Sequence, residues 1–517
     1  MDGPTTLATI FMGLVFLWSI FLVYDVRQRP NPPTLFSSLR LLAHCIPAIF
    51  LLAICTTAQR FGDQALIWFF SLIAFRYWRI IVNIFFWFRY KPVLAVGNEK
   101  ITPRDCTIIV PTVGPSGNSV FAEMVAAILV NSPGRLIFST NTDQAAQQVQ
   151  AILPQIIEDL KAGTTSYQQQ FRLGPINTTT DIQITNANVS NKRHQVVKAF
   201  EMVVTEILVM VDDTAVWHPR FLPATIPAFA NEKVGFVGTR KWVKRIPYVT
   251  DLSAGYLKNL WMSYWTGFWN AMGGIYLVRH NFEIRATNAA DGGVFCVSGR
   301  SSLLRTNIVN NDDFKDSFLN EYILRFGDRF PGWGPVTADD DNFITRHVIN
   351  HGWDIKIQYS EEAAMTTVLG KFPLKFPDQC LRWSRSTFRQ NPIALFADRT
   401  IWWKWPLTVW TTYLPWMYNA ALIWDVLAIF ALTQTNVFVH SAHQVAILCG
   451  FVAFIWMTKL IKTIPWFWAY PMDFLLYFLI PAYPLFAYYH SLLKIWTFFT
   501  FWDLAWSGRK LSKPKKE

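Results

Sequence analysis

Two aspartates follow directly on a short apolar stretch of the sequence. Ile207–Val211 has the length and composition of a buried β-strand, and Asp212 and Asp213 come immediately after it. In an open parallel sheet this position lies at the carboxyl edge, where ligands bind. Mg²⁺ and Mn²⁺ prefer oxygen ligands and are commonly held by one or two carboxylates together with substrate phosphates. The pair therefore indicates a metal site, although aspartates are also common in simple turns after strands.

A second acidic cluster consists of Asp339, Asp340 and Asp341, ahead of a predicted helix over residues 342–349. One aspartate there could serve only as a helix N-cap, which the helix dipole favours. Three carboxylates in succession repel one another, so their presence favours a bound cation or a role in proton transfer.

Basic and aromatic residues form two further groups that could bind a phosphorylated sugar. Lys192 and Arg193 open a predicted helix over residues 192–204, and a helix N-terminus attracts phosphate. Arg382 offers a planar fork for phosphate, and Trp383 offers a flat face on which a sugar can stack. Each group also has a simpler interpretation. The first could be a solvated surface, and the second a basic, aromatic helix at a membrane interface.

Short apolar runs that alternate with helical patterns surround these candidate residues in the sequence. They occur between residues 91 and 398 and predict an α/β domain. The predicted strands are 107–110, 135–139, 181–185, 207–211, 234–237, 294–297 and 355–359. The chemistry is therefore expected just after the ends of these strands.

Long apolar stretches lie on both sides of the middle domain. Of the 517 residues, 52% are hydrophobic and 16% are charged, which argues against a disordered or purely soluble protein. Residues 1–90 predict two or three transmembrane helices, and Arg76 and Arg79 interrupt the third. Residues 399–517 predict an interfacial helix, three or four further spans and a basic tail from Arg509. The predicted spans are 7–24, 41–58, 64–88, 407–432, 445–460 and the remainder to 506, broken near Pro481 and Pro484.

The net charge of +12 needs no nucleic acid as a partner. Lys and Arg collect on cytoplasmic membrane flanks, so the charge is expected of a multi-pass membrane protein whose middle domain is cytosolic. The six cysteines contain no CxxC pair, which indicates neither a zinc site nor a disulfide framework.

The order and spacing of these motifs resemble the membrane-embedded family-2 glycosyltransferases, the processive polysaccharide synthases that include hyaluronan, chitin and cellulose synthases. The motifs are most similar to those of hyaluronan synthase and cover most of residues 107–389. Val211 stands where that family has the first Asp of Asp-x-Asp, and Cys380 replaces its second Gln, so the chain resembles a divergent relative. The matching segments are Asn191-Lys192-Arg193, Val211-Asp212-Asp213-Thr214, Cys296-Val297-Ser298-Gly299, Ala338-Asp339-Asp340 and Gln379-Cys380-Leu381-Arg382-Trp383.

The resemblance implies a GT-A-type α/β domain inserted between N-terminal and C-terminal transmembrane helices. It implies an inverting transferase that adds sugars from a UDP-sugar to a growing polysaccharide and passes the polymer across the bilayer, the plasma membrane being the expected location. Asp340 is the implied catalytic base, and Asp213, assisted by Asp212, is the implied ligand of Mn²⁺ or Mg²⁺. The implied donor-binding residues are Thr112, Lys192, Arg193, Asp212, Gln379, Arg382 and Trp383. The implied acceptor-binding residues are Ser298, Gly299, Trp333 and Asp339. A homo-oligomer is compatible with this scheme.

Two alternatives stay open at the level of sequence. One is a non-processive family-2 enzyme that glycosylates a lipid or a short acceptor and makes products of fixed small size. The other is a membrane transporter or scaffold whose α/β domain only binds nucleotide. The Gln379, Arg382 and Trp383 segment, with several predicted spans after it, favours the processive synthase.

Overall fold

The computed structural model describes residues 3–97, 100–246, 248–324, 332–369 and 375–504. The predicted basic tail from Arg509 lies outside these residues. The chain forms two compact units. The first contains residues 1–90, 289–293 and 391–496, and the second contains residues 91–288, 294–390 and those from 497 onward.

The second unit is built on a mixed, nine-stranded sheet in the order β3-β2-β1-β4-β7-β6-β9-β5, with β8 also paired to β6. Strands β3, β2, β1 and β4 run parallel, and β7 is antiparallel to β4. The long strand β6 pairs with β7 and β8 along its first half and with β9 along its second half. The strands are β1 Cys106–Thr112, β2 Arg135–Thr140, β3 Asp181–Asn186, β4 Ile207–Val211, β5 Ala215–Trp217, β6 Val234–Val243, β7 Ser301–Arg305, β8 Asp354–Gln358 and β9 Ala364–Thr367.

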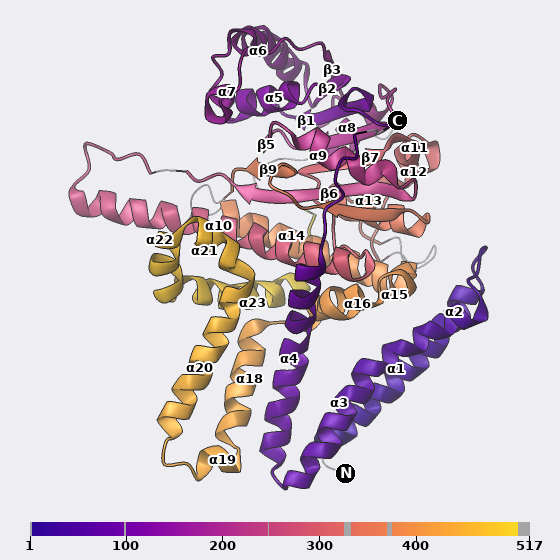
Figure 1. The fold of residues 1–517 in the computed structure, drawn as a ribbon, viewed down its shortest axis with the longest axis vertical. Coiled ribbons are helices and arrows are strands. Elements are labelled where there is room, and N and C mark those ends of the chain that lie inside the picture. The colour runs from indigo at the N-terminus through magenta and orange to yellow at the C-terminus, as the bar shows by residue number, and fades with distance from the viewer. Residues whose placement is uncertain (1–2, 98–99, 247, 325–331, 370–374, 505–517) are drawn as a thin grey trace. The chain divides into compact units, whose positions relative to one another are not determined.

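Helices connect and cover these strands (Figure 1). Helices α6 and α8 both pack against β2, and α8 also packs against β1. The helices are α5 Phe121–Val130, α6 Asp143–Ala162, α7 Ser166–Phe171, α8 Lys192–Phe200, α9 Phe221–Thr225, α10 Tyr256–Asp291, α11 Thr306–Val309, α12 Asp312–Leu319, α13 Asp340–Asn350 and α14 Lys375–Pro392. The last residues of α10, from Ala289, and of α14, from Asn391, belong to the first unit.

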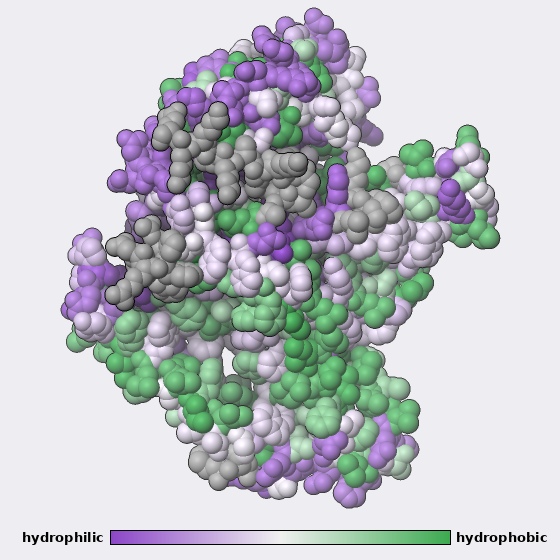
Figure 2. Space-filling view, turned by 180° about the vertical axis from the view of Figure 1, so that it is seen from behind, coloured by the Kyte–Doolittle hydropathy of each residue, from purple (hydrophilic) through white to green (hydrophobic). Residues whose placement is uncertain are grey.

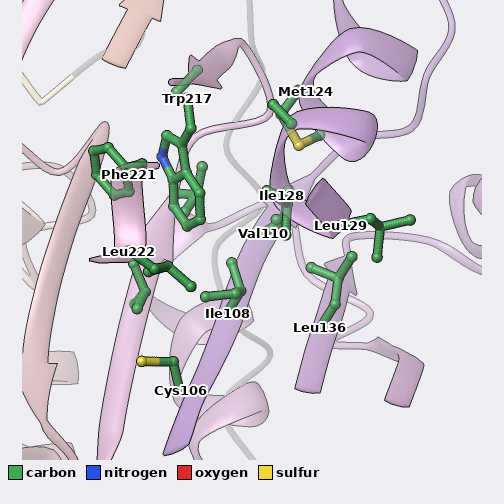
Figure 3. Packing of buried hydrophobic residues seen from close by; sticks show 14 of the residues in the cluster. Cys106, Ile108, Val110, Met124, Ile128, Leu129, Leu136, Trp217, Phe221 and Leu222 are labelled. Carbon is green, nitrogen blue, oxygen red and sulfur yellow. The ribbon is translucent and has the colours of Figure 1, made fainter. Parts of the chain in front are cut away.

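The core of the second unit forms around β1. Its alternate side chains Cys106, Ile108 and Val110 lie among residues of α5 and of the segment from Trp217 to Leu222 (Figure 3). All seven residues of β1 and all five of β4 are buried, as expected for parallel strands covered on both faces. The Trp217 ring stacks on Phe221 at 4.3 Å between centroids, and its Nε1 donates to Ser301 Oγ at 2.8 Å. Trp217 thereby ties β5 to β7, next to the loop that carries Asp212 and Asp213.

Most of the predicted strands are found, within a few residues at either end. The prediction over residues 294–297 is wrong, because these mostly buried residues form no strand, and the strand of that region is β7, Ser301–Arg305. The main-chain N–H of Val297 donates to Thr345 Oγ1 at 3.1 Å, so a side chain satisfies it in place of a neighbouring strand.

The first unit is helical, and four of its helical segments are long and apolar enough to cross a membrane: 3–27, 35–57, 64–89 and 444–469. Two bent pairs, 406–418 with 421–433 and 471–479 with 482–498, raise this number to six if each is one span. The bends, 88° and 62°, fall where the sequence places Asn419-Ala420 and Pro481. The helices are α1 Gly3–Arg27, α2 Leu35–Leu39, α3 Cys45–Ala58, α4 Gln64–Arg89, α15 Thr400–Lys404, α16 Pro406–Thr408, α17 Leu414–Tyr418, α18 Ala421–Thr433, α19 Asn436–Val439, α20 Gln444–Leu460, α21 Ile464–Ala469, α22 Pro471–Asp473 and α23 Ala482–Phe498.

Arg76, one of the two arginines that interrupt the third predicted span, is paired inside the first unit. Its guanidinium Nη2 lies 2.6 Å from Asp425 Oδ1 of α18, and Lys459 Nζ of α20 lies 2.8 Å from Asp425 Oδ2. The carboxylate of Asp425 is almost fully buried. One buried anion therefore holds two cations from two other helices, which is how charge is tolerated within apolar helices.

We predict that Asp425→Asn destabilises the protein by about 3–5 kcal/mol, because it leaves two buried cations without their anion. A triple variant, Arg76→Met, Asp425→Leu and Lys459→Met, should lose much less stability, because it removes all three charges together. Thermal unfolding of the full chain in detergent measures both effects. An Asp425→Asn melting temperature equal to that of the wild type would contradict this account.

Candidate active site

The first acidic pair lies at the carboxyl end of β4, beside the end of β1. Thr112, the last residue of β1, donates its hydroxyl to Asp213 Oδ2 at 2.8 Å, and Asn118 Nδ2 donates to the Asp213 main-chain oxygen at 2.7 Å. The Asp212 N–H donates to the Arg300 carbonyl at 3.0 Å. These bonds fix the loop after β4, so that both carboxylates stay at the edge of the sheet.

Lys192 joins the first acidic pair to the second acidic cluster. It is the first residue of α8, whose N-cap Asn191 accepts a bond from the N–H of Arg193. The Lys192 Nζ lies 2.9 Å from Asp212 Oδ1 and 2.9 Å from Asp340 Oδ2. Burial alone would lower the pKa of this ammonium group, but the two carboxylates raise it above its ordinary value. Lys192 is therefore charged, and it brings together residues that are more than a hundred positions apart in the sequence.

Asp212 is ionised for a related reason. Burial alone would raise its pKa, but the charges of Lys192, Arg300 and Arg382 hold the pKa below its ordinary value. An ionised carboxylate at this place can bind a divalent cation.

The three aspartates of the second cluster have three different surroundings. Asp340 begins α13 and faces Lys192. Asp339, just before the helix, binds the Arg389 guanidinium through both oxygens, at 2.7 and 2.9 Å, and accepts the Ser386 hydroxyl. Burial alone would raise the pKa of Asp339, but Arg389 and Ser386 hold it below its ordinary value. Burial and the neighbouring charge of Asp340 raise the pKa of Asp341.

The predicted acceptor residues Ser298 and Gly299 lie against this cluster. The Gly299 N–H faces Asp341 Oδ2 at 3.4 Å. A Cβ atom added at Gly299 would lie 3.1 Å from Asp340 Oδ2 and 3.4 Å from Lys192 Nζ. Glycine therefore lets the backbone approach the charged side chains closely.

Helix α14 carries Gln379, Arg382 and Trp383. The Trp383 ring lies 5.1 Å from the Tyr276 ring, and the Arg300 guanidinium carbon lies 5.0 Å from its centre, a cation–π contact. Arg382 contributes positive charge to the surroundings of Asp212 and of Arg300. Gln379 lies one helical turn before Trp383 on the same helix.

Arg300 is a residue that the sequence interpretation did not single out. It follows Gly299, contacts Trp383 and acts on the pKa of Asp212 together with Arg382. Two guanidinium groups and one ammonium group therefore act on a single aspartate. Guanidinium groups of this kind are suited to bind a diphosphate. A basic residue next to the Ser-Gly segment was the signal available in the sequence.

Two of the predicted binding residues, Arg193 and Asp339, are buried with their charged groups bound to other protein groups. Arg193 is 1% exposed, and its guanidinium donates to the carbonyls of Ala338 and Phe318 and pairs with Glu321 at 2.7 Å. The N–H groups of its guanidinium bind other protein groups, so Arg193 stabilises the segment before Asp339. Asp339 is likewise enclosed by its partners, so it faces protein groups and not an acceptor.

Trp333 lies in another part of the second unit. It forms an isolated bridge with Ile323, its ring lies 6.3 Å from that of Trp502, and 39% of its surface is exposed. A sugar could stack on this exposed ring.

The residues at the end of β4 fit a hard divalent cation. Two carboxylates, Asp212 and Asp213, offer oxygen ligands at the sheet edge. Within the described ranges, no three His, Cys, Asp or Glu side chains gather closely enough to hold a metal by themselves. A cation there would complete its shell with water and with donor phosphates, the usual arrangement for Mg²⁺.

A buried lysine lies behind the site. Lys241 of β6 is 2% exposed, and its Nζ lies 2.6 Å from His280 Nδ1 of α10. Burial, with a contribution from the charge of Arg300 and against those of Cys296 and Asp341, lowers the pKa of Lys241 to about 7. Below that pH the folded protein must hold the positively charged ammonium group of Lys241 out of contact with solvent.

We predict a pH-dependent effect of Lys241→Met. In the unfolded chain Lys241 keeps its ordinary pKa of 10.5, so between pH 7 and 10.5 the unfolded state binds more protons at this position. The wild type should therefore gain stability with rising pH relative to the variant, at about 1.4 kcal/mol per pH unit. Unfolding curves from pH 7 to 10 measure this difference. Lys233→Met, at an exposed position, is the control, and a Lys241→Met difference that is the same at every pH would contradict the assignment.

Comparison with known proteins identifies the family of this chain. Residues 103–386 match the family model described as "Glycosyltransferase like family 2". A type 2 glycosyltransferase of Zymoseptoria tritici is 30% identical over 86% of this chain and 84% of its own length. One from Pyricularia oryzae is 28% identical over 84% of this chain and 80% of its own length. The solved structure of the mannosyltransferase PcManGT of Pyrobaculum calidifontis, in complex with GDP-Man and Mn²⁺, is 13% identical to this chain. The match covers 83% of this chain and 97% of that protein's chain, with a TM-score of 0.42. The family model spans more than half of the chain, so the protein belongs to the family-2 glycosyltransferases, with a GT-A-like domain on a mixed, curled sheet.

Proposed function

We propose that this glycosyltransferase is processive. It transfers sugars from a UDP-sugar to the end of a growing polysaccharide with inversion of the anomeric carbon, and it passes the polymer through its own membrane helices. The contact of Lys192 with both Asp212 and Asp340 is the observation on which the proposal depends. It joins a carboxylate suited to the donor end of the reaction to a carboxylate suited to the acceptor end.

Inversion in one displacement requires a base for the acceptor and a stabilised leaving group. Asp340 is the base in this proposal. It takes the proton of the acceptor hydroxyl while that oxygen bonds to the anomeric carbon of the donor sugar, and the bond from this carbon to the diphosphate oxygen breaks. Lys192 Nζ lies 2.9 Å from Asp340 Oδ2 and holds a positive charge beside the base.

The leaving UDP carries the charge that develops in the transition state. Lys192, Arg300 and Arg382 supply positive charge at the end of β4, where the diphosphate would lie. Asp213, with Asp212 assisting, would hold Mn²⁺ or Mg²⁺, and the ion would stabilise the diphosphate as a Lewis acid. Thr112 orients Asp213 through its hydroxyl bond.

Aromatic side chains are the proposed acceptor surface. Trp383 stands on α14 with Arg300 across one face and Tyr276 beside it. The exposed ring of Trp333 is a second stacking surface. Extrusion of a polymer is supported by the number of apolar helices, four or up to six, that flank the catalytic domain in the sequence.

We predict that Asp340→Asn lowers turnover by about 10²–10⁴-fold, the range for loss of a general base, while donor binding stays within a few-fold of the wild type. UDP release from a radiolabelled donor measures turnover, and equilibrium binding of the donor measures affinity. Asp312→Asn, at an exposed position on α12, is the matched control and should behave as the wild type. Turnover of Asp340→Asn at the control rate would refute the role of the base.

Product length tests processivity separately. The purified full chain, supplied with a panel of labelled UDP-sugars and with Mn²⁺ or Mg²⁺, should form products that stay long when enzyme is scarce relative to acceptor. Gel separation before and after glycosidase digestion would show their length and sugar. Products limited to one added sugar would identify the non-processive enzyme instead. Absence of any divalent-dependent UDP release with every donor would count against transfer from a UDP-sugar.

A further inference from the structure

The longest helix of the second unit begins in a projection that carries large apolar side chains on its surface. We call residues 248–261 the α10 arm. They comprise the segment before α10 and the first turns of that helix, and they stand away from the sheet in Figure 1, with the reverse side visible in Figure 2. Leu252 is 97% exposed and Val249 is 83% exposed. The exposed apolar residues of the arm are Val249, Leu252, Tyr256, Leu257, Leu260 and Trp261.

Polar contacts, and not these apolar residues, hold the arm in its conformation. Asn259 Oδ1 accepts bonds from the Tyr248 hydroxyl at 2.9 Å and from the Asp251 N–H at 3.0 Å. Asn259 Nδ2 donates to the carbonyls of Asp251 and Ala254 at 2.9 and 3.0 Å. The turn is therefore ordered by one asparagine, and the apolar side chains are left available for contact with something else.

The character of α10 changes along its length. Trp261 stacks with Trp265 at 5.9 Å, and Trp265 stacks with Phe268 at 5.7 Å, so aromatic rings follow one another from the arm inward. From Asn270 onward most of the helix is buried. The buried half fixes the helix in the protein, and the first half carries aromatic and aliphatic groups outward.

We propose that the α10 arm inserts its apolar side chains into the surface of a lipid bilayer. Tryptophan and tyrosine are the residues that favour the boundary between headgroups and hydrocarbon, and Leu252 and Leu257 would enter below them. Asp251 is the single acidic residue among residues 248–261, and Lys258 offsets it, so the arm carries no net negative charge against anionic headgroups.

A bilayer is the occupant that the apolar helices of the same chain suggest. The first unit contains four helical segments able to cross a membrane, and α10 runs without a break from the arm to Asp291, which belongs to that unit. The arm and a bilayer would thus be held together by covalent linkage, which raises their effective concentration. A second copy of the chain is a weaker candidate, because a stable protein interface takes about 20–30 residues on each side, and the arm is shorter than that.

Spin-label accessibility of the full chain in lipid nanodiscs tests this proposal. Cys449 is the exposed cysteine of the described residues and is replaced first by Cys449→Ser, and a nitroxide is then attached through Leu252→Cys. The matched control is Gln150→Cys, at an exposed polar position on α6. We expect collisions with oxygen to exceed collisions with a water-soluble nickel chelate several-fold at position 252, and the reverse at position 150.

Three results would overturn the proposal. If the label at position 252 shows the same ratio of oxygen to nickel-chelate collisions as the label at position 150, the arm lies in water. Dipolar broadening between two labels at position 252 would place it against a second copy. Adding Leu257→Asp and Leu260→Asp to the Leu252→Cys chain provides an independent check, because these charges should shift the label towards the water-exposed pattern. An unchanged label would contradict insertion.

Discussion

The ammonium group of Lys192 is the contact on which the arrangement of the site depends. It lies at the same distance, 2.9 Å, from a carboxylate that follows β4 and from one that begins α13. Without a cation between them, the two carboxylates would repel each other. Lys192 can occupy this place because Asn191 caps α8 and fixes its first residue at the sheet edge. Three elements of the fold therefore meet at one nitrogen atom.

The fold could be predicted from the sequence where a single local pattern decided the structure. β4 coincides with its predicted range, and α8 begins at the predicted residue, because a continuous apolar run and a capped basic start are strong signals. Strands β5 and β9 have three and four residues and carry no recognisable period. Residues 294–297 look like a strand because they are apolar, but they take no part in a ladder, and the Val297 N–H bonds to the Thr345 side chain. The long helix α10 was not anticipated, since its pattern changes from exposed aromatic residues to a buried half.

The site was harder to predict because residue type does not reveal partners. Arg193 and Arg300 are both arginines beside recognisable motifs. The guanidinium of Arg193 is bound by Ala338, Phe318 and Glu321, whereas that of Arg300 lies over the Trp383 ring. A buried arginine with three protein partners positions a loop, and one that acts on a reactive carboxylate can take part in binding. The difference lies in contacts between residues far apart in the sequence. The same holds for Arg76, whose partners Asp425 and Asn419 lie more than 300 positions further along the chain.

Asp339 shows what such constraints mean for the choice of amino acid at one position. Its φ of +63° lies in the left-handed region, which asparagine, aspartate and glycine tolerate best. Its carboxylate must also neutralise Arg389, which is buried and takes both oxygens. Glycine and asparagine tolerate the positive φ but cannot neutralise Arg389. Glutamate carries the negative charge but tolerates the positive φ poorly. Aspartate meets both requirements, so position 339 leaves the chain almost no freedom of substitution even though it lies one residue outside the proposed chemistry.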